Sequence, residues 1–405
     1  MPEPPMSMPK PRCVMCSHCS RQQPRYLYRT LVSGGGKGAR GGSMGGMTFT
    51  DVSQSTPSAA AHHRPPEVAL AAASGIHTLA YPGVTPVVTT CGEQATPALL
   101  GELRQVARAL CARAFVLVQE LLATGPDTRA VAHTKSEAWD PVTRADLAVE
   151  AMVSEYLATH RPGDGLIGEE GTRRPADEDG SGITWVVDPV DGTVNFVYGI
   201  PMSAVSIGVM VGEELCVGAV VNLTTGELFH AARGQGAAVE TPQSSAARPG
   251  EDSCSTAEGT TRGELHWGAP RALHVNAPET LPVSLLATGF SYDPARRARQ
   301  GAMLASLLGT VRDIRRAGSA ALDLCQLAQG RVDLYWEHAL NVWDFAAGAV
   351  IAAEAGAVVC VPTADLRADD GAPIFAAAPS VAADCARALA EVGGWDTLPA
   401  AAATA

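Results

Sequence analysis

The chain has 405 residues, of which 46% are hydrophobic and 18% are charged. This is the composition of a globular protein, and it excludes a chain that is disordered over most of its length. Thirty Lys and Arg against 42 Asp and Glu give a formal charge of −12. A general binder of nucleic acid or acidic membranes needs the opposite balance, so we expect no nucleic-acid partner.

Residues 1–96 differ in composition from the rest of the chain. They hold Pro clusters and a Gly-rich run at 33–42, and no sustained apolar period, so we predict a disordered N-terminal extension. Met44 and Met47 are alternative start sites. Cys13, Cys16 and Cys19 have the spacing of a zinc or cluster site but lack a fourth ligand at matching spacing, which favours an unstructured tail.

From Thr96 onward the apolar residues become periodic. Leu99 to Leu121 recur at helical spacing up to Thr124-Gly125-Pro126, and a second helix is expected over 143–158. Strand-like runs follow with the spacing of antiparallel neighbours: Trp185 to Val187, Ala204 to Val211, Leu215 to Val221 and Leu228 to Ala231.

Residues 241–264 are rich in Ser, Ala, Gly, Pro and charge, and we interpret them as a surface loop insertion. After it, strands alternate with helices, which predicts a layered α/β fold. The expected strands are Ser284 to Thr288, Val332 to Trp336, Ala357 to Val361 and Ile374 to Ala378; the expected helices are Ala298 to Leu308, Ala320 to Gln329, Val342 to Glu354 and Val381 to Val392.

The chain contains no apolar run near the roughly 18 residues that span a bilayer, and its N-terminus has no apolar signal segment. We therefore expect a cytoplasmic protein without a membrane partner. Scattered cysteines fit that compartment and are expected to act mostly as small buried hydrophobic residues: Cys91, Cys111, Cys216, Cys254, Cys325, Cys360 and Cys385.

Acidic residues that could carry chemistry occur in four segments. The most informative is Trp185 to Phe196, where three apolar residues predict a buried strand and Asp188 stands at its expected end. Pro189 is expected to stop the strand ladder, and Gly192 permits a positive φ, so Asp188 and Asp191 should point the same way from a turn. Two such carboxylates suit Mg2+, and free amides of a following helical turn suit a phosphate. An Asx-turn without chemistry is the alternative for this segment alone.

The other three segments are weak singly. Glu169-Glu170 could be a solvated pair, Asp344 a helix N-terminal acid, and Asp146 a solvated helix residue. The occurrence of all four segments in order is the specific signal.

Over residues 97–395 this pattern resembles the inositol monophosphatase family. Asp188-Pro189-Val190-Asp191-Gly192-Thr193 through Phe196 looks like its first signature, and Trp343-Asp344-Phe345-Ala346-Ala347-Gly348 looks like its second. The resemblance implies a layered α/β/α/β/α sandwich with an antiparallel N-terminal sheet and a mixed C-terminal one. Residues 396–405 would then be a disordered tail.

The resemblance also implies a site with two or three Mg2+ ions. Glu169, Asp188 and the Val190 carbonyl would hold one metal ion, and Asp188, Asp191 and Asp344 would hold another. Glu170 would assist through the outer shell or a further metal, and Asp146 and Thr193 would orient the attacking water. Lys135 has the spacing of a family lysine near the metals, although a solvated lysine is equally compatible.

Substrate contacts follow from the same resemblance. The amides of Gly192 and Thr193 would hold the phosphate, and the hydroxyl groups of the substrate would meet the residues Asp191, Gly318, Ser319, Ala320 and Glu337. Asn341 stands where some members carry a histidine or arginine, a departure that affects substrate choice.

The expected activity is hydrolysis of a small phosphorylated polyol, first of all inositol-1-phosphate, by a homodimer. Histidinol phosphate, fructose-1,6-bisphosphate and 3′-phosphoadenosine-5′-phosphate are alternative substrates for the same metal site. Lithium sensitivity is a family expectation. A regulatory binding protein that has kept the fold is the alternative of another class, and a zinc or redox role of the N-terminal cysteines is a third.

Overall fold

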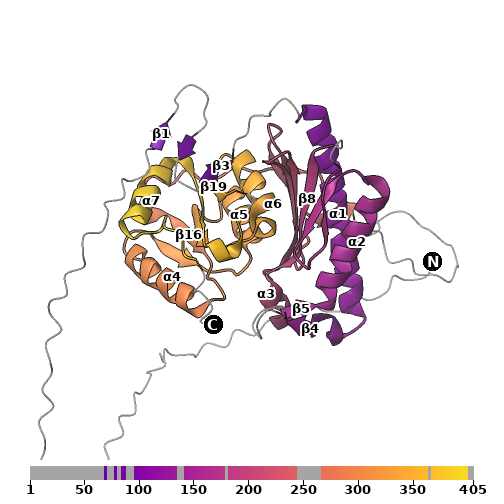
Figure 1. The fold of residues 1–405 in the computed structure, drawn as a ribbon. Coiled ribbons are helices and arrows are strands. Elements are labelled where there is room, and N and C mark those ends of the chain that lie inside the picture. The colour runs from indigo at the N-terminus through magenta and orange to yellow at the C-terminus, as the bar shows by residue number, and fades with distance from the viewer. Residues whose placement is uncertain are drawn as a thin grey trace, which may run out of the picture. The chain divides into compact units, whose positions relative to one another are not determined.

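Two β-sheets and three helical layers alternate in the computed structural model (Figure 1). The structure describes residues 68–70, 77–79, 84–87, 95–134, 141–177, 181–243, 266–363 and 366–399, all of which belong to the unit His62–Ala405. The expected five-layer α/β/α/β/α order is thus confirmed. No helix in this part of the chain is long and apolar enough to cross a membrane.

The first helical layer and the larger sheet are formed by residues 97–272. The layer holds α1 (Pro97–Ala123) and α2 (Arg144–His160). The eight-stranded sheet has, in spatial order, β15 (Arg271–Ala272), β12 (Ala237–Glu240), β11 (Leu228–Ala232), β10 (Glu214–Asn222), β9 (Ala204–Val211), β8 (Ile183–Asp191), β6 (Gly165–Gly168) and β7 (Arg173–Arg174). All neighbours pair antiparallel except β6 and β8, which are parallel. The expected antiparallel sheet is therefore wrong for this one pair of strands.

The other three layers are formed by residues 285–391, together with the N-terminal strand β3. The middle layer holds α5 (Ala320–Ala328) and α6 (Val342–Glu354), and the outer layer holds α4 (Pro294–Leu307) and α7 (Pro379–Glu391). Between them lies a mixed sheet with the order β17 (Asp313–Arg315), β16 (Leu285–Thr288), β18 (Leu334–His338), β20 (Pro373–Ala377), β19 (Val358–Pro362) and β3 (Val84–Pro86).

Short elements complete the described chain. They are β1 (Val68–Leu70) paired with β2 (His77–Leu79), β4 (Val131–Thr134) paired with β5 (Pro141–Thr143), β13 (Pro242–Gln243) paired with β14 (His266–Trp267), the helix α3 (Thr193–Tyr198), and the 3-10 turns η1 (Pro126–Arg129), η2 (Leu281–Val283) and η3 (Ala368–Asp370).

Two segments outside the predicted domain of residues 97–395 contact the rest of the described chain. Strand β3, in the section expected to be disordered, pairs with β19. Leu398, in the expected tail, is fully buried and its amide donates to the Gly371 carbonyl. Both contacts join segments far apart in sequence, which local composition does not reveal. Cys13, Cys16, Cys19, Met44, Met47 and most of the 241–264 insertion lie outside the described residues.

Three hydrophobic clusters fill the spaces between the layers. Strands of the large sheet are buried on both faces, so Trp185 and Val187 of β8 pack under α1 and α2 while Val186 packs against the middle layer. A third cluster lies between the mixed sheet and α4 and α7. Five of the expected buried cysteines belong to the described chain and are buried thiols that form no disulfide bond: Cys111, Cys216, Cys325, Cys360 and Cys385.

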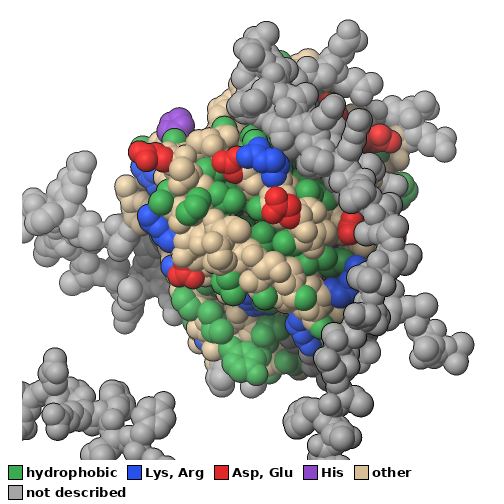
Figure 2. Space-filling model, turned by 90° about the vertical axis from the view of Figure 1, so that its left-hand side faces the viewer, with side chains coloured by type: hydrophobic (Ala, Val, Ile, Leu, Met, Phe, Trp, Pro, Cys, Tyr) green, Lys and Arg blue, Asp and Glu red, His purple; other side chains and the backbone are tan. Residues whose placement is uncertain are grey.

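The outer surface beside α4 and α7 carries mixed charge. On the face in Figure 2, acidic and basic side chains are interspersed among hydrophobic and other ones. The formal charge of −12 is therefore not gathered into one acidic field on the visible part of this face.

A buried polar network fastens α1 to the large sheet. Arg104 Nε donates to His230 Nδ1 at 2.8 Å, and His230 Nε2 lies 2.9 Å from Glu240 Oε1. Arginine has no acceptor, so Nδ1 must be unprotonated and the proton sits on Nε2, which donates to Glu240. Burial, with the nearby Arg104 charge, lowers the pKa of His230 to about 4.

Acidification should therefore weaken the fold through His230. Because its folded pKa lies below the ordinary value of 6.5, its contribution is complete above pH 6.5 and is lost as the pH falls toward 4, by up to about 3 kcal/mol. His230→Asn keeps an acceptor for Arg104 but cannot titrate. We expect this variant to lose less unfolding free energy than the wild type between about pH 7 and pH 5 in urea titrations; equal losses would contradict this role.

Candidate active site

A β-bulge brings Asp188 and Asp191 to the same side of β8. Residues three apart on a regular strand face opposite sides. Here the β8–β9 register runs from Asp188 opposite Ser206 to Asp191 opposite Ala204, so β8 contains one extra residue and the faces coincide. The strand thus continues through Pro189, where we predicted that it ends, but both carboxylates point one way as predicted. The Val190 amide donates to Asp188 Oδ1 at 3.0 Å.

The start of α5 holds Asp191 in place. Ser319 Oγ donates to Asp191 Oδ2 at 2.6 Å, and the Ala321 amide donates to the same oxygen at 2.7 Å. Ser319, which the family resemblance assigns to the substrate, is therefore already engaged with a carboxylate of the site. Despite these bonds, burial raises the pKa of Asp191 to about 6, with a contribution from the Glu169 charge.

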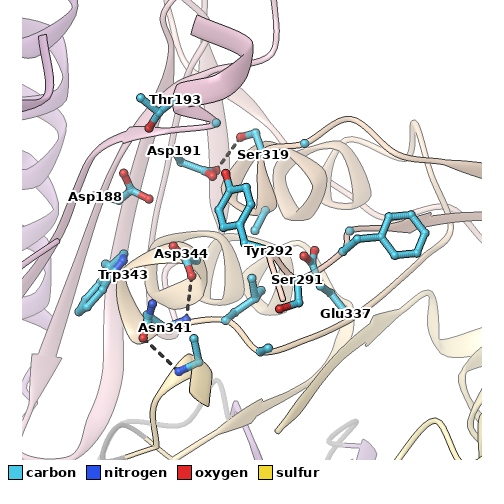
Figure 3. A pocket seen from close by; sticks show the side chains of 18 of the residues that line it. Asp188, Asp191, Thr193, Ser291, Tyr292, Ser319, Glu337, Asn341, Trp343 and Asp344 are labelled. Atoms are coloured by element: carbon cyan, nitrogen blue, oxygen red, sulfur yellow. Dashed lines mark hydrogen bonds between the residues drawn. The ribbon is translucent and has the colours of Figure 1, made fainter. Parts of the chain in front are cut away.

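The start of α6 places Asp344 opposite this pair. The Asn341 amide donates to Asp344 Oδ2 at 2.7 Å, and Asn341 Oδ1 accepts from the Ala368 amide at 3.1 Å. Figure 3 shows Asp188, Asp191 and Asp344 pointing into one space between β8 and α6. Asn341 thus joins the helix N-terminus to η3, which is a wall of the same cavity.

Thr193 and Asp146 lie next to each other beside the strand β8 that carries Asp188 and Asp191. Thr193 Oγ1 is 3.4 Å from Asp146 Oδ1 and 2.9 Å from the Val190 carbonyl. Asp146 is fully buried, and its Oδ2 accepts from the amide and hydroxyl of Thr143. Burial raises the pKa of Asp146 to about 7 in spite of the Thr143 bonds. The predicted pairing of these two side chains is present, with the hydroxyl closer to Val190.

The two glutamates of the turn after β6 have different positions. Glu169 lines the cavity and contributes to the raised pKa of Asp188, whereas Glu170 does not line it. Glu170 is close enough to raise the pKa of Asp146, after the larger effect of burial. Lys135 lies outside the described residues, so its predicted place at the site has no structural account.

The carboxylates open into a cavity of about 590 Å³. Glu337 from β18 lines it from the mixed sheet and accepts from the Tyr335 hydroxyl at 2.7 Å. Burial raises the pKa of Glu337 to about 7. Most of the predicted site residues line this cavity: Glu169, Asp188, Val190, Asp191, Gly192, Thr193, Gly318, Ser319, Ala320, Glu337, Asn341 and Asp344. Of the other predicted residues that the structure describes, Asp146 and Glu170 do not line it.

The donor set fits a hard divalent cation. Within the described chain no group of three or more His, Cys, Asp or Glu is placed to hold a metal ion as it stands. Yet the pKa of Asp188 is raised well above its ordinary value by burial and by the charges of Glu169, Asp191 and Asp344. Such mutual repulsion in one buried space is relieved by a cation, and oxygen ligands alone are the preference of Mg2+ or Ca2+.

Asn195 is a site residue that sequence reasoning missed. Its side-chain amide donates to the carbonyl groups of Met202 at 2.7 Å and Ala317 at 2.8 Å, so it ties α3 to the turn before α5. An asparagine two residues after Thr193, within the first signature segment, was the available signal, but its partner at 317 is distant in sequence.

Comparison with known proteins agrees with this geometry. The model of the inositol monophosphatase family matches residues 100–393, and the chain belongs to this family. An inositol-1-monophosphatase of Mycobacterium leprae is 41% identical over 302 residues, which cover 72% of this chain and 95% of that protein. The solved structure titled Mycobacterium tuberculosis SuhB is 40% identical with a TM-score of 0.55, and the match covers 73% of this chain and 98% of that one.

A further relative has a different name. A Nus factor SuhB of Haemophilus influenzae is 36% identical over 233 residues, 57% of this chain and 75% of that protein. Membership of this generally metal-dependent family supports a phosphatase, while the names of the relatives do not agree on one role.

Gly192 is the glycine on which the site's geometry depends most directly. Its φ is +84°, and a Cβ there would lie 2.8 Å from the Met202 carbonyl oxygen and 3.0 Å from that of Gly318. We expect Gly192→Ala to lower the unfolding free energy by about 2–4 kcal/mol, because strain and overpacking add. Gly212, with φ +62° and open space around it, is the matched control, and Gly212→Ala should cost only about 1 kcal/mol in urea unfolding. Equal costs would show that the contacts of Gly192 do not matter.

Proposed function

We propose that this protein is a Mg2+-dependent phosphate monoester hydrolase. The observation that carries the proposal is the convergence of Glu169, Asp188, Asp191 and Asp344 on one cavity that Thr193 also lines. These carboxylates come from three separate segments, and a structural role alone would not favour gathering them against their own repulsion.

The residues that would hold Mg2+ are the ligands that the resemblance to the inositol monophosphatase family implies. Glu169, Asp188 and the Val190 carbonyl form one set, and Asp188, Asp191 and Asp344 form the other. When bound, the metal would lower the pKa of a coordinated water and neutralise charge on the phosphate oxygens.

The chain's own groups supply orientation at the reacting phosphate. Thr193 Oγ1, between Asp146 and the Val190 carbonyl, has one proton to donate and lone pairs left to accept from the attacking water. The buried Asp146 holds the hydroxyl in that orientation. The amides of Gly192 and Thr193, at the start of α3, are the proposed donors to the phosphate oxygens.

Groups for the rest of the substrate lie further along the cavity. Glu337 is a buried acceptor for substrate hydroxyl groups, with Tyr335 fixing one of its oxygens. A polyol with adjacent hydroxyl groups matches such an acceptor, and the M. leprae relative is named for inositol-1-phosphate chemistry. We propose inositol-1-phosphate as the first substrate, with histidinol phosphate, fructose-1,6-bisphosphate and 3′-phosphoadenosine-5′-phosphate as alternatives at the same metal site.

The relatives named Nus factor keep open a binding role of another class for this chain. The complete carboxylate set together with Asp146 and Thr193 favours the enzyme. A protein kept only for binding would have no need of these buried acids.

Phosphate release in the presence of Mg2+ tests the proposal directly. We expect the wild type to hydrolyse at least one of the four phosphate esters and Asp188→Asn to lose at least about 10³-fold in kcat/KM, because it removes a carboxylate shared by both metal sets. The control is Asp333→Asn, since Asp333 is also buried, accepts from the Leu285 amide at 2.8 Å and does not line the cavity. Removal of metal by EDTA should abolish turnover. Absence of hydrolysis with Mg2+ shown to be bound would refute these substrates. Absence of hydrolysis together with absence of Mg2+ binding would favour the binding role.

The Thr193 hydroxyl should act on turnover rather than on metal binding. We expect Thr193→Val to lower kcat about 10²-fold, the usual contribution of a positioned proton-transfer group. The Mg2+ dissociation constant from calorimetry should stay within about threefold, because the side chain is not among the proposed ligands. A variant with wild-type kcat would exclude Thr193 from orienting the water.

A further inference from the structure

Helix α2 carries a second buried carboxylate one turn after Asp146. Glu150 stands four residues later, so the two side chains project from the same face of the helix. Glu150 is 4% exposed. Its Oε2 accepts from the Glu170 amide at 2.8 Å and its Oε1 accepts from the Thr172 amide at 3.0 Å. Both oxygens therefore accept hydrogen bonds from the backbone of the turn that follows β6.

The backbone approaches Glu150 closely. A Cβ on Gly168 would lie 2.6 Å from the Glu150 carboxylate, so a side chain there would displace that carboxylate. On its other side this segment pairs with β8, where Gly168 lies opposite Val187 and the Glu169 amide donates to the Val187 carbonyl at 3.1 Å. Glu169 is thus fixed from two directions, by the strand that leads to Asp188 and by Glu150.

We propose that Glu150 is a positioning residue for the metal end of the site. It holds the Glu169–Glu170 turn so that the Glu169 carboxylate faces Asp188, and it thereby sets the affinity for the metal ion between them. This inference rests on the proposed metal-dependent function. Helix α2 then serves both halves of the machinery, since Asp146 holds the Thr193 hydroxyl and Glu150 holds the Glu169 turn.

Replacement by glutamine isolates this role. Glu150→Gln keeps size and shape, but one acceptor oxygen becomes an NH2 group that must face a backbone N–H. One of the two bonds is then lost and two donors oppose each other. The turn can relieve this only by moving, and Glu169 moves with it.

Calorimetric titration of the metal-free, full-length protein with Mg2+ alone is the decisive experiment. We expect Glu150→Gln to raise the Mg2+ dissociation constant about 10–100-fold, the usual cost of losing a group that orients a metal ligand. The matched control is Glu354→Gln. Glu354 accepts from the Gly234 and Gly236 amides at 2.8 and 2.7 Å in the β11–β12 turn and does not line the cavity. The control should stay within about twofold.

Two further readouts separate positioning from general damage. In phosphate-release assays the Mg2+ concentration for half-maximal rate should rise with the dissociation constant, while kcat at saturating Mg2+ stays within about threefold. In amide hydrogen exchange, Glu170 and Thr172 should lose protection while the β8 amides keep it. If Glu150→Gln does not fold, Gly168→Ala, which displaces the same carboxylate, should give the same weakened Mg2+ binding.

The outcomes distinguish this inference from the proposed function. Wild-type protein that binds Mg2+ and hydrolyses a phosphate ester, with Glu150→Gln binding Mg2+ equally well, overturns the role of Glu150 alone. Wild-type protein that binds no Mg2+ overturns the proposed function and this inference together. Equal weakening in Glu150→Gln and Glu354→Gln also overturns it, because the effect would then belong to any carboxylate that accepts from two backbone amides.

Discussion

Repulsion between carboxylates in one buried space is the constraint on which the site depends. Asp188, Asp191 and Asp344 each have a pKa raised above the ordinary value, with burial as the largest cause and the neighbouring acids adding to it. Each acid is accordingly held by a backbone amide: Val190 for Asp188, Ala321 for Asp191 and Asn341 for Asp344. The partial positive charges of these amide N–H groups fix the positions of the carboxylates but do not neutralise their negative charge. A bound cation would neutralise it.

The five-layer order makes this gathering possible. The large sheet supplies Asp188 and Asp191 through the β8 bulge, and the middle layer supplies helix starts that meet them, with Ser319 before α5 and Asp344 in α6. The mixed sheet supplies Glu337 from β18. Every one of these positions lies within a strand or at the start of a helix rather than in a long loop. Because the acids cannot drift apart to relieve their repulsion, their spacing is preset for a ligand.

Much of this could be predicted from the sequence, and the failures share one cause. Apolar periodicity is a local property, so β9 and α6 were predicted with the bounds observed, and the signature segments located the carboxylates Asp188, Asp191 and Asp344 that line the cavity. The continuation of β8 through Pro189 was missed because a bulge depends on its partner strand. The engagement of Ser319 with Asp191, 128 residues away, and the pairing of β3 with β19 were missed because they are contacts between distant segments. Local residue types do not encode which distant backbone will supply a hydrogen bond.

The two ends of the cavity are built differently, and this separates chemistry from recognition. At the end that holds the carboxylates, strand and helix termini fix the side chains through short hydrogen bonds to backbone amides. At the other end the walls are the segment Gly289–Asp293 and the turn η3, which are connections between elements. Connections accept changes of length and residue type at little cost to the core. In the proposed function, the same carboxylates would therefore serve different phosphate esters, and the choice among these esters would rest with residues that no signature segment contains.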